Sequence, residues 1–211
     1  MENSDSAYSP KKLNRRVLIG FAGAAFFGQM SLSQAQPAER AGTVTELKGD
    51  AFAELQNQRR ALEQSAALFI KDTVGTGSDA RLTMRLGKDT TLHLGQLARL
   101  TIDRFLVNAG GDITLDAGPM LFDSPAGRLV PLQVHSSFGL IAVRGTRFFA
   151  GPSNGVFGVF VERGRVAVTA AGVQVVVGEG QGTNIARPGD APTTPAPWGA
   201  PRINAAMQSV Q

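Results

Sequence analysis

Two β-rich segments of this chain are joined by the run Val143-Arg144-Gly145-Thr146-Arg147-Phe148. Gly145 favours a turn within the run, because glycine adopts positive φ without the steric cost that other residues meet. The sequence continues with apolar residues at 156–161, a turn at Arg163-Gly164 and alternating valines at 166–168. Short apolar segments separated by glycine turns are typical of paired β-strands. We therefore expect this part of the chain to form strands joined by tight turns.

The same pattern extends over most of the chain, from Gly42 to about Ile185. Apolar residues alternate with polar ones within residues 81–86, 92–94, 99–103 and 112–116, and Val173, Val175 and Val177 close the series. A period of two is the pattern of a half-buried strand, and glycine and asparagine mark the turns between these segments. The sequence predicts a single all-β domain of many short strands, arranged as a β-sandwich, a jelly-roll-like fold or a β-helical wrap.

Two segments depart from the strand pattern. Residues 60–67 (RALEQSAA) have helical propensity but lie between strand signals, so we expect a loop or a single helical turn. Residues 186–211 are rich in proline, which cannot donate to a sheet ladder. We expect this C-terminal tail to lie extended over the domain or to hang free, with a helical turn at 203–210.

The composition narrows the chemistry that is available. The chain has 211 residues, enough for one medium domain with tails, and 43% of them are apolar, enough for a packed core. Cysteine is absent, which excludes disulfides, cysteine zinc sites and a thiol nucleophile.

The N-terminus has the layout of an export signal. Arg15 and Arg16 precede an apolar stretch at 17–28 and small residues at 33–35, where a signal peptidase would cut. We predict a twin-arginine signal at residues 1–35 and export to the periplasm, with an uncleaved inner-membrane anchor as the alternative. The apolar stretch is shorter than the roughly 20 residues of a membrane span, which favours cleavage.

Cleavage would also change the charge of the chain. Residues 1–35 hold four basic and two acidic side chains, so their removal lowers the formal net charge from +4 to +2. A nearly neutral mature chain gives little support for nucleic acid as a partner.

The run at 143–148, the strand after it and the pattern Gly164-x-Val166-x-Val168 together resemble the core motif of FecR domains. Further segments resemble other steps of that family's pattern in the same order, at 42–49, 76–82, 87–94 and 118–122. Ser136-Ser137 stands where the family often has Thr-Pro. The resemblance implies a β-rich periplasmic module, which we assign to residues 36–185.

We interpret Arg144, Gly145, Thr146 and Gly164 as structural residues of this motif. Gly145 turns the backbone, Thr146 caps the turn, and Arg144 ties neighbouring strands through its planar donors. A recognition patch formed by residues 144–146 is the alternative.

The histidines and carboxylates predict no catalytic or metal site. His93 and His135 are the only histidines, and both lie in strand patterns beside apolar residues, so we interpret them as structural. Asp112 and Asp116 share a strand face with Thr114. Paired carboxylates can serve a hydrolase or bind calcium, but alternating aspartates are more typical of a solvated strand face.

No cofactor site is predicted either. The loop Gly178–Gly182 is not followed by the helix that a phosphate-binding glycine loop requires. Arg81 with Arg85, and Arg163 with Arg165, offer a modest basic surface for an acidic partner or a glycan, although a plain solvated face is the simpler reading.

The FecR resemblance implies a non-catalytic exported module that binds a periplasmic or outer-envelope protein in a sensory or scaffolding role. A carbohydrate- or peptidoglycan-binding module is the alternative, and an envelope hydrolase using Asp112 or Asp116 is a third reading. Family members that control sigma factors carry a cytoplasmic helical domain before the β domain, whereas only residues 1–14 precede Arg15. We therefore expect no direct contact with a cytoplasmic sigma factor.

Overall fold

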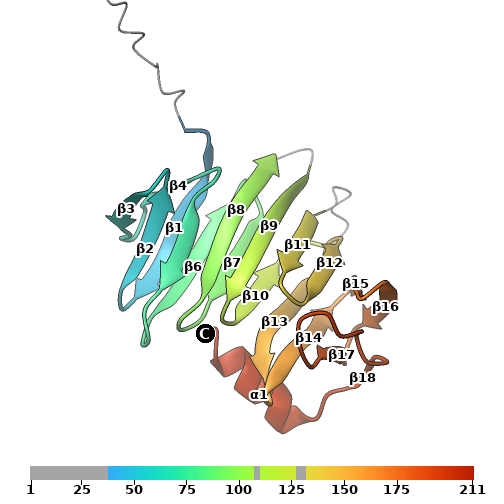
Figure 1. Ribbon diagram of the computed structural model, residues 1–211. Coiled ribbons are helices and arrows are strands. Elements are labelled where there is room, and N and C mark those ends of the chain that lie inside the picture. The colour runs from blue at the N-terminus through green and yellow to red at the C-terminus, as the bar shows by residue number, and fades with distance from the viewer. Residues whose placement is uncertain (1–37, 107–109, 127–131) are drawn as a thin grey trace, which may run out of the picture. The chain divides into compact units, whose positions relative to one another are not determined.

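The alternating apolar segments form two β-sheets, as the sequence predicts (Figure 1). The computed structural model describes residues 38–106, 110–126 and 132–211, which belong to one compact unit, Pro37–Gln211. The predicted export signal, with Arg15 and Arg16, lies outside the described residues. Within the described ranges, no helix is both long and apolar enough to cross a membrane.

Each sheet has nine strands. Sheet A contains, in spatial order, β18 (Ala196–Pro197), β17 (Gln181–Ile185), β14 (Val156–Arg163), β13 (Arg147–Ser153), β10 (Met120–Asp123), β7 (Thr90–Leu94), β6 (Arg81–Leu86), β1 (Arg40–Lys48) and β4 (Ala67–Phe69). Sheet B contains β16 (Val173–Gly178), β15 (Arg165–Ala170), β12 (Gly139–Val143), β11 (Leu132–Ser136), β9 (Gly110–Ala117), β8 (Arg99–Leu106), β5 (Thr73–Thr76), β2 (Ala51–Leu55) and β3 (Gln58–Ala61).

Along both sheets the strands lie in nearly the same order as in the sequence. The chain passes repeatedly from one sheet to the other, so β10 of sheet A lies in the sequence between β9 and β11 of sheet B. β9 and β11 are parallel, with Ile113 opposite Val134, whereas β11 and β12 form an antiparallel hairpin. A parallel pair needs a crossover connection, which β10 supplies. The fold is a β-sandwich whose chain winds between its two sheets.

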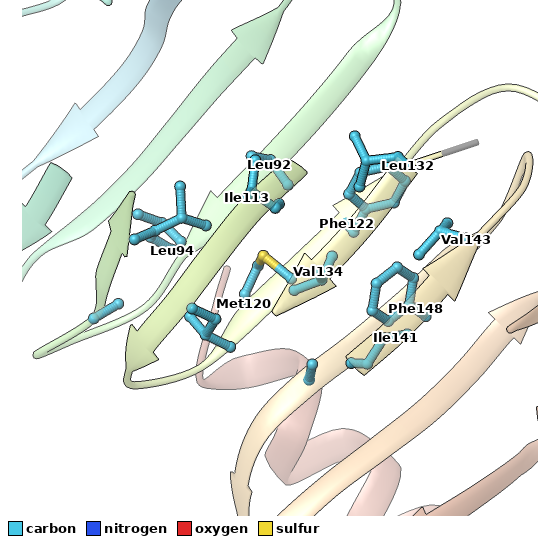
Figure 2. Packing of buried hydrophobic residues seen from close by; sticks show 14 of the residues in the cluster. Leu92, Leu94, Ile113, Met120, Phe122, Leu132, Val134, Ile141, Val143 and Phe148 are labelled. Carbon is cyan, nitrogen blue, oxygen red and sulfur yellow. The ribbon is translucent and has the colours of Figure 1, made fainter. Parts of the chain in front are cut away.

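The main core lies between the sheets. Phe122 and Phe148 extend inward from neighbouring strands of sheet A, with ring centroids 5.3 Å apart. Ile113 and Val134 of sheet B belong to the same buried cluster, as Figure 2 shows. Every second residue of a strand faces the same side, so the alternation seen in the sequence is what brings these apolar side chains together.

A third layer covers part of the outer face of sheet A. After β18, the helix α1 (Ala200–Gln208) lies against the side of sheet A that faces away from sheet B (Figure 1). Leu121, Phe149 and Phe160 of the sheet pack there with Trp198 and Ala206. Residues 186–199 contain no helix and are held on the domain, as one of the two expectations for this tail has it, whereas the helix at Ala200–Gln208 is longer than the single turn expected at 203–210. Their apolar side chains bury the outward-facing aromatic residues of sheet A.

Residues 60–67 also differ from their propensity. Instead of a loop or a helical turn throughout, the segment contains the end of β3 and the start of β4. Ala61 pairs with Phe52 across the sheet, and the guanidinium of Arg60 contacts the buried carboxylate of Asp72. These long-range contacts outweigh the weak local preference for helix.

Candidate functional site

The motif turn, residues 144–146, carries the chain from β12 of sheet B to β13 of sheet A. Gly145 has φ of +61° and Gly164 has φ of +88°, the left-handed region that favours glycine. Thr146 is fully buried between these turns, and a Cβ on Gly164 would lie 2.8 Å from its Cγ2. The Thr146 carbonyl accepts a hydrogen bond of 3.1 Å from the Ser124 amide. The two glycines thus allow two crossing turns to pack on one threonine.

Arg144, the first residue of this turn, and Arg147, which follows the turn, have different surroundings. Arg144 is exposed, and no hydrogen bond or ion pair holds it to any other described residue. The tie between strands that the sequence assigns to Arg144 is instead made by Arg147. Arg144 lies in the crossing itself, whereas Arg147 begins β13 and faces the outer side of sheet A, where β10 and β14 offer carboxylates.

Arg147 is the centre of a charged network across three strands. Its Nη1 donates to Asp123 of β10 at 2.7 Å, and its Nε donates to Glu162 of β14 at 2.5 Å. Arg163 donates to the other oxygen of Asp123 at 2.9 Å and to the Ser124 carbonyl at 2.8 Å. Partial burial alone would lower the pKa of Arg147, but the hydrogen bonds to Glu162 and Asp123 outweigh it and raise the pKa. The network has satisfied partners and is a structural feature.

A groove of about 630 Å³ opens on the outer face of sheet A, beside the end of α1. We call it the polar groove. Strands β1, β6 and β7 supply its floor, the turns after β5 and β7 supply part of its rim, and the residues after α1 form one wall. Its lining consists of Glu46, Leu47, Lys48, Asp79, Arg81, Thr83, His93, Gln96, Val210 and Gln211.

His93 lies in the floor of the polar groove. Its Nδ1 is 3.1 Å from the hydroxyl of Thr83, which also lies 3.5 Å from the carboxylate of Glu46. Burial lowers the pKa of His93, and the positive charge of Arg147 lowers it further, while Asp123 and Glu46 oppose these effects. The hydrogen bond to Thr83 is consistent with the structural role predicted for this histidine.

The aspartates on the outer face of sheet B each have a separate partner. Asp112 accepts from Arg104 at 2.7 Å and lies 3.8 Å from the Nε2 of His135. Asp116 accepts from Thr101 at 3.2 Å. This is a strand face of cross-strand polar pairs, not a concave site with two facing carboxylates. Across residues 38–106, 110–126 and 132–211, no group of three or more His, Asp or Glu side chains is placed to hold a metal ion.

Residues 72–167, from the turn before β5 into β15, match the model of the family described as FecR protein. This part of the chain is a FecR domain. The match contains the motif turn and most of the Arg147 network, so the FecR resemblance predicted from the sequence is confirmed. No curated protein matches the chain.

Two crystal structures of a "putative anti-sigma factor" from Parabacteroides distasonis have a similar fold. Both have a TM-score of 0.54 with this chain, at 13% and 14% sequence identity. The similarity covers 64% of this chain and 64% of each of those chains. At this identity the likeness concerns the fold alone.

The polypeptide that carries the FecR domain also has an open sheet edge, which the sequence analysis did not single out. β16 pairs with β15 on one side and ends sheet B on the other. Val173 and Val176 are 44% and 58% exposed, and together with Leu97 they are the exposed large apolar side chains of the described residues. The signal in the sequence is the uncharged run Val173–Gly178, which reads like a core strand although it lies at an edge.

The remaining predicted residues take simple positions. Arg81 and Arg85 lie four residues apart on β6, and only Arg81 lines the polar groove. Gly178–Gly182 covers the end of β16, a turn at 179–180 and the start of β17, so a strand and not a helix follows the turn. Arg163 belongs to the Arg147 network, whereas Arg165 is exposed at the start of β15.

Proposed function

We propose that this chain is a non-catalytic binding module with a sensory or regulatory role outside the cytoplasm, and that it holds a protein partner along the edge of β16. Two findings support the regulatory class: the FecR domain, and a fold shared with a protein described as a "putative anti-sigma factor". The observation that carries the mode of binding is the open edge of β16.

The backbone of β16 is arranged to accept another strand. The two-residue turn Ala171-Gly172 has φ values of +48° and +75°, as a tight hairpin requires. In such a hairpin the amides of Gln174, Val176 and Gly178 point away from β15. Gly178 satisfies its amide with the side chain of Gln181 at 3.1 Å. The outward backbone groups of Gln174 and Val176 are left to pair with a partner strand.

The other three sheet edges are protected in ways that β16 is not. β4 has only three residues, and β18 has two, one of which is Pro197. β3 carries Arg59 and Arg60. Short strands, proline and charge are the usual means by which proteins prevent strand addition at an edge. The six uncharged residues of β16 favour strand addition by a protein partner.

A photoreactive residue at position 176 tests this proposal in living cells. We expect benzoylphenylalanine at Val176 to cross-link to one discrete foreign polypeptide, and the same residue at exposed Ala142, on the face of sheet B, to give no adduct. The variant Gln174→Pro should abolish the adduct, because it removes an outward amide without removing a backbone hydrogen bond to β15. Gln174→Ala is its control, since both variants lose the side-chain bond of 3.1 Å to Thr169 and only the proline loses the amide.

Four outcomes would contradict the proposal. Equal labelling from Ala142, or labelling that survives Gln174→Pro, would show that strand addition is not responsible. An adduct of two copies of this chain would replace the foreign partner by self-association. Absence of any adduct in cells that express the chain at its native level would remove β16 as the binding edge.

The glycan-binding alternative has no specific support on the described surface. Glycan sites use exposed aromatic rings as stacking platforms, but Trp198 is only 8% exposed and stacks on Phe160. The hydrolase alternative has none either, because Asp112 and Asp116 bind different partners on an open face.

Export is tested separately through the predicted twin-arginine signal. We expect Arg15→Lys with Arg16→Lys to retain the chain in the cytoplasm, because a twin-arginine translocase recognises the two guanidinium groups. Cell fractionation measures this, with Lys11→Arg and Lys12→Arg as the matched control. Normal export of the double lysine variant would contradict the twin-arginine assignment.

A further inference from the structure

The polar groove holds charged side chains of both signs that do not pair with one another. Lys48 and Arg81 are its cations, and Glu46 and Asp79 are its anions. No ion pair joins any of the four to another residue in the described part of the chain. On the same face of sheet A, Arg147 binds two carboxylates. Unpaired charges of opposite sign around a concavity are complementary to a ligand that carries both charges itself.

The side chain of Arg81 also has a hydrogen-bond donor without an acceptor. Its Nη1 donates to the Ala80 carbonyl at 3.0 Å, but its Nε is buried and has no partner among the described atoms. A buried N–H without an acceptor is unfavourable. A carboxylate is the acceptor that suits a guanidinium best, because two parallel N–H groups can bind its two oxygens after a small rotation of the side chain.

The register of β1 and β6 separates the charges along the groove. Lys48 is paired with Arg81, and the next outward-facing pair is Glu46 with Thr83. Successive pairs on one face of a sheet lie two residues apart, about 7 Å at the usual rise per residue. Two residues of an extended chain span about the same distance. The groove therefore presents the two cations Lys48 and Arg81 and the anion Glu46 at the spacing of a dipeptide's termini, with Asp79 on the rim beside the cations.

We infer that the polar groove binds a short peptide with a free ammonium and a free carboxylate, in the simplest case a dipeptide. The carboxylate lies at Lys48 and Arg81, and the ammonium lies at Glu46. A ligand with one sign of charge would be repelled by one end of the groove. The volume of about 630 Å³ suits a small ligand of this size.

Calorimetry on the full chain with alanyl-alanine and its blocked forms tests the inference. We expect alanyl-alanine to bind, and either N-acetylation or C-terminal amidation to weaken binding about tenfold or more, because each removes one charge-assisted contact. A peptide blocked at both ends should not bind.

Two variants assign the ends of the peptide to their side chains. In Arg81→Gln, amidation should weaken binding much less than in the wild type, because the carboxylate keeps only Lys48 as a partner. In Glu46→Gln, alanyl-alanine and its N-acetyl form should bind equally. Arg85→Gln is the matched control, since Arg85 lies on the same strand and face but does not line the groove. It should preserve the full difference between free and blocked peptides.

The inference is overturned if alanyl-alanine fails to bind at millimolar concentration. It is also overturned if blocking either end leaves the affinity unchanged, or if Arg81→Gln and Arg85→Gln have the same effect. Circular dichroism of both variants shows that any loss of binding is not a loss of fold.

Discussion

Arg144, in the motif turn, and Arg147, directly after it, allow a direct measurement of how much stability an arginine contributes when it joins neighbouring strands. Arg147 joins β10, β13 and β14 through Asp123 and Glu162, and its side chain is 22% exposed. Arg144, three residues earlier, is exposed. Since both are arginines in one short segment, the same substitution can be compared at both positions.

We expect Arg147→Met to lower the free energy of unfolding by about 1–2 kcal/mol, because it leaves Glu162 without a partner and Asp123 with Arg163 alone in a partly buried network. Arg144→Met should change it by less than about 0.5 kcal/mol, as is usual for an exposed side chain. Urea denaturation measures both. Equal effects at the two positions would show that the network adds no stability.

His93 gives the fold a dependence on pH. Burial, and then the charge of Arg147, lower the pKa of His93 below the ordinary value of 6.5. A histidine of this kind stabilises the folded state above pH 6.5, where it is neutral in both states. As the pH falls below that value, the unfolded chain gains the proton first, and the stability is lost progressively until the lowered pKa is passed.

We therefore expect the free energy of unfolding to fall more steeply between about pH 7 and about pH 5 in the wild type than in His93→Gln. Glutamine can retain a hydrogen bond to Thr83 but does not titrate. Identical slopes for the wild type and His93→Gln would refute the assignment.

Among the elements, α1 depends on packing more than on its own sequence. It has nine residues, no side-chain cap at Gly199 and no charged residue placed to favour either end. Isolated helices of this length are not stable in water. Its docking on Leu121, Phe149 and Phe160 therefore supplies most of its stability.

Two neighbouring alanines test this docking. Ala206 is 4% exposed against sheet A, and Ala205 is exposed. Ala206→Asp should displace the helix, because it buries an unpaired charge, and Ala205→Asp should not. The emission of Trp198, the only tryptophan, reports the result. A shift to longer wavelength is expected for Ala206→Asp alone, and native emission in that variant would contradict the docking described here.

How far the sequence predicts an element depends on whether its signal is local. The strands follow from the period of two, and the motif turn follows from its glycine. The docking of α1 does not, because the prolines before it suggest a free tail and its partners Leu121 and Phe149 lie far away in the sequence. The polar groove is equally hidden, since a register shift between Val44 and Glu46 decides which β1 residues face outward.

At the scale of the whole molecule, one apolar cluster connects both sheets. It runs from Val44 in β1 to Ile185 in β17 without interruption. We expect the sandwich to unfold in one cooperative step, since this one cluster holds the two sheets together from end to end. Hydrogen exchange in increasing urea should expose the amides of β5 and β15 at the same denaturant concentration. Earlier exposure of either strand would indicate unravelling from one end, as in repeat proteins.

The nearly sequential order of strands along both sheets has one more consequence, for how such a chain can vary in length. Each excursion from one sheet to the other and back adds material to both layers and touches only its immediate neighbours. Inserting or deleting one such segment at a turn between the sheets would lengthen or shorten the sandwich. Every other strand would keep its neighbours, except those next to the inserted or deleted segment. An insertion in the middle of the sandwich therefore leaves the edge of β16 unchanged at one end and the edges of β3 and β4 unchanged at the other.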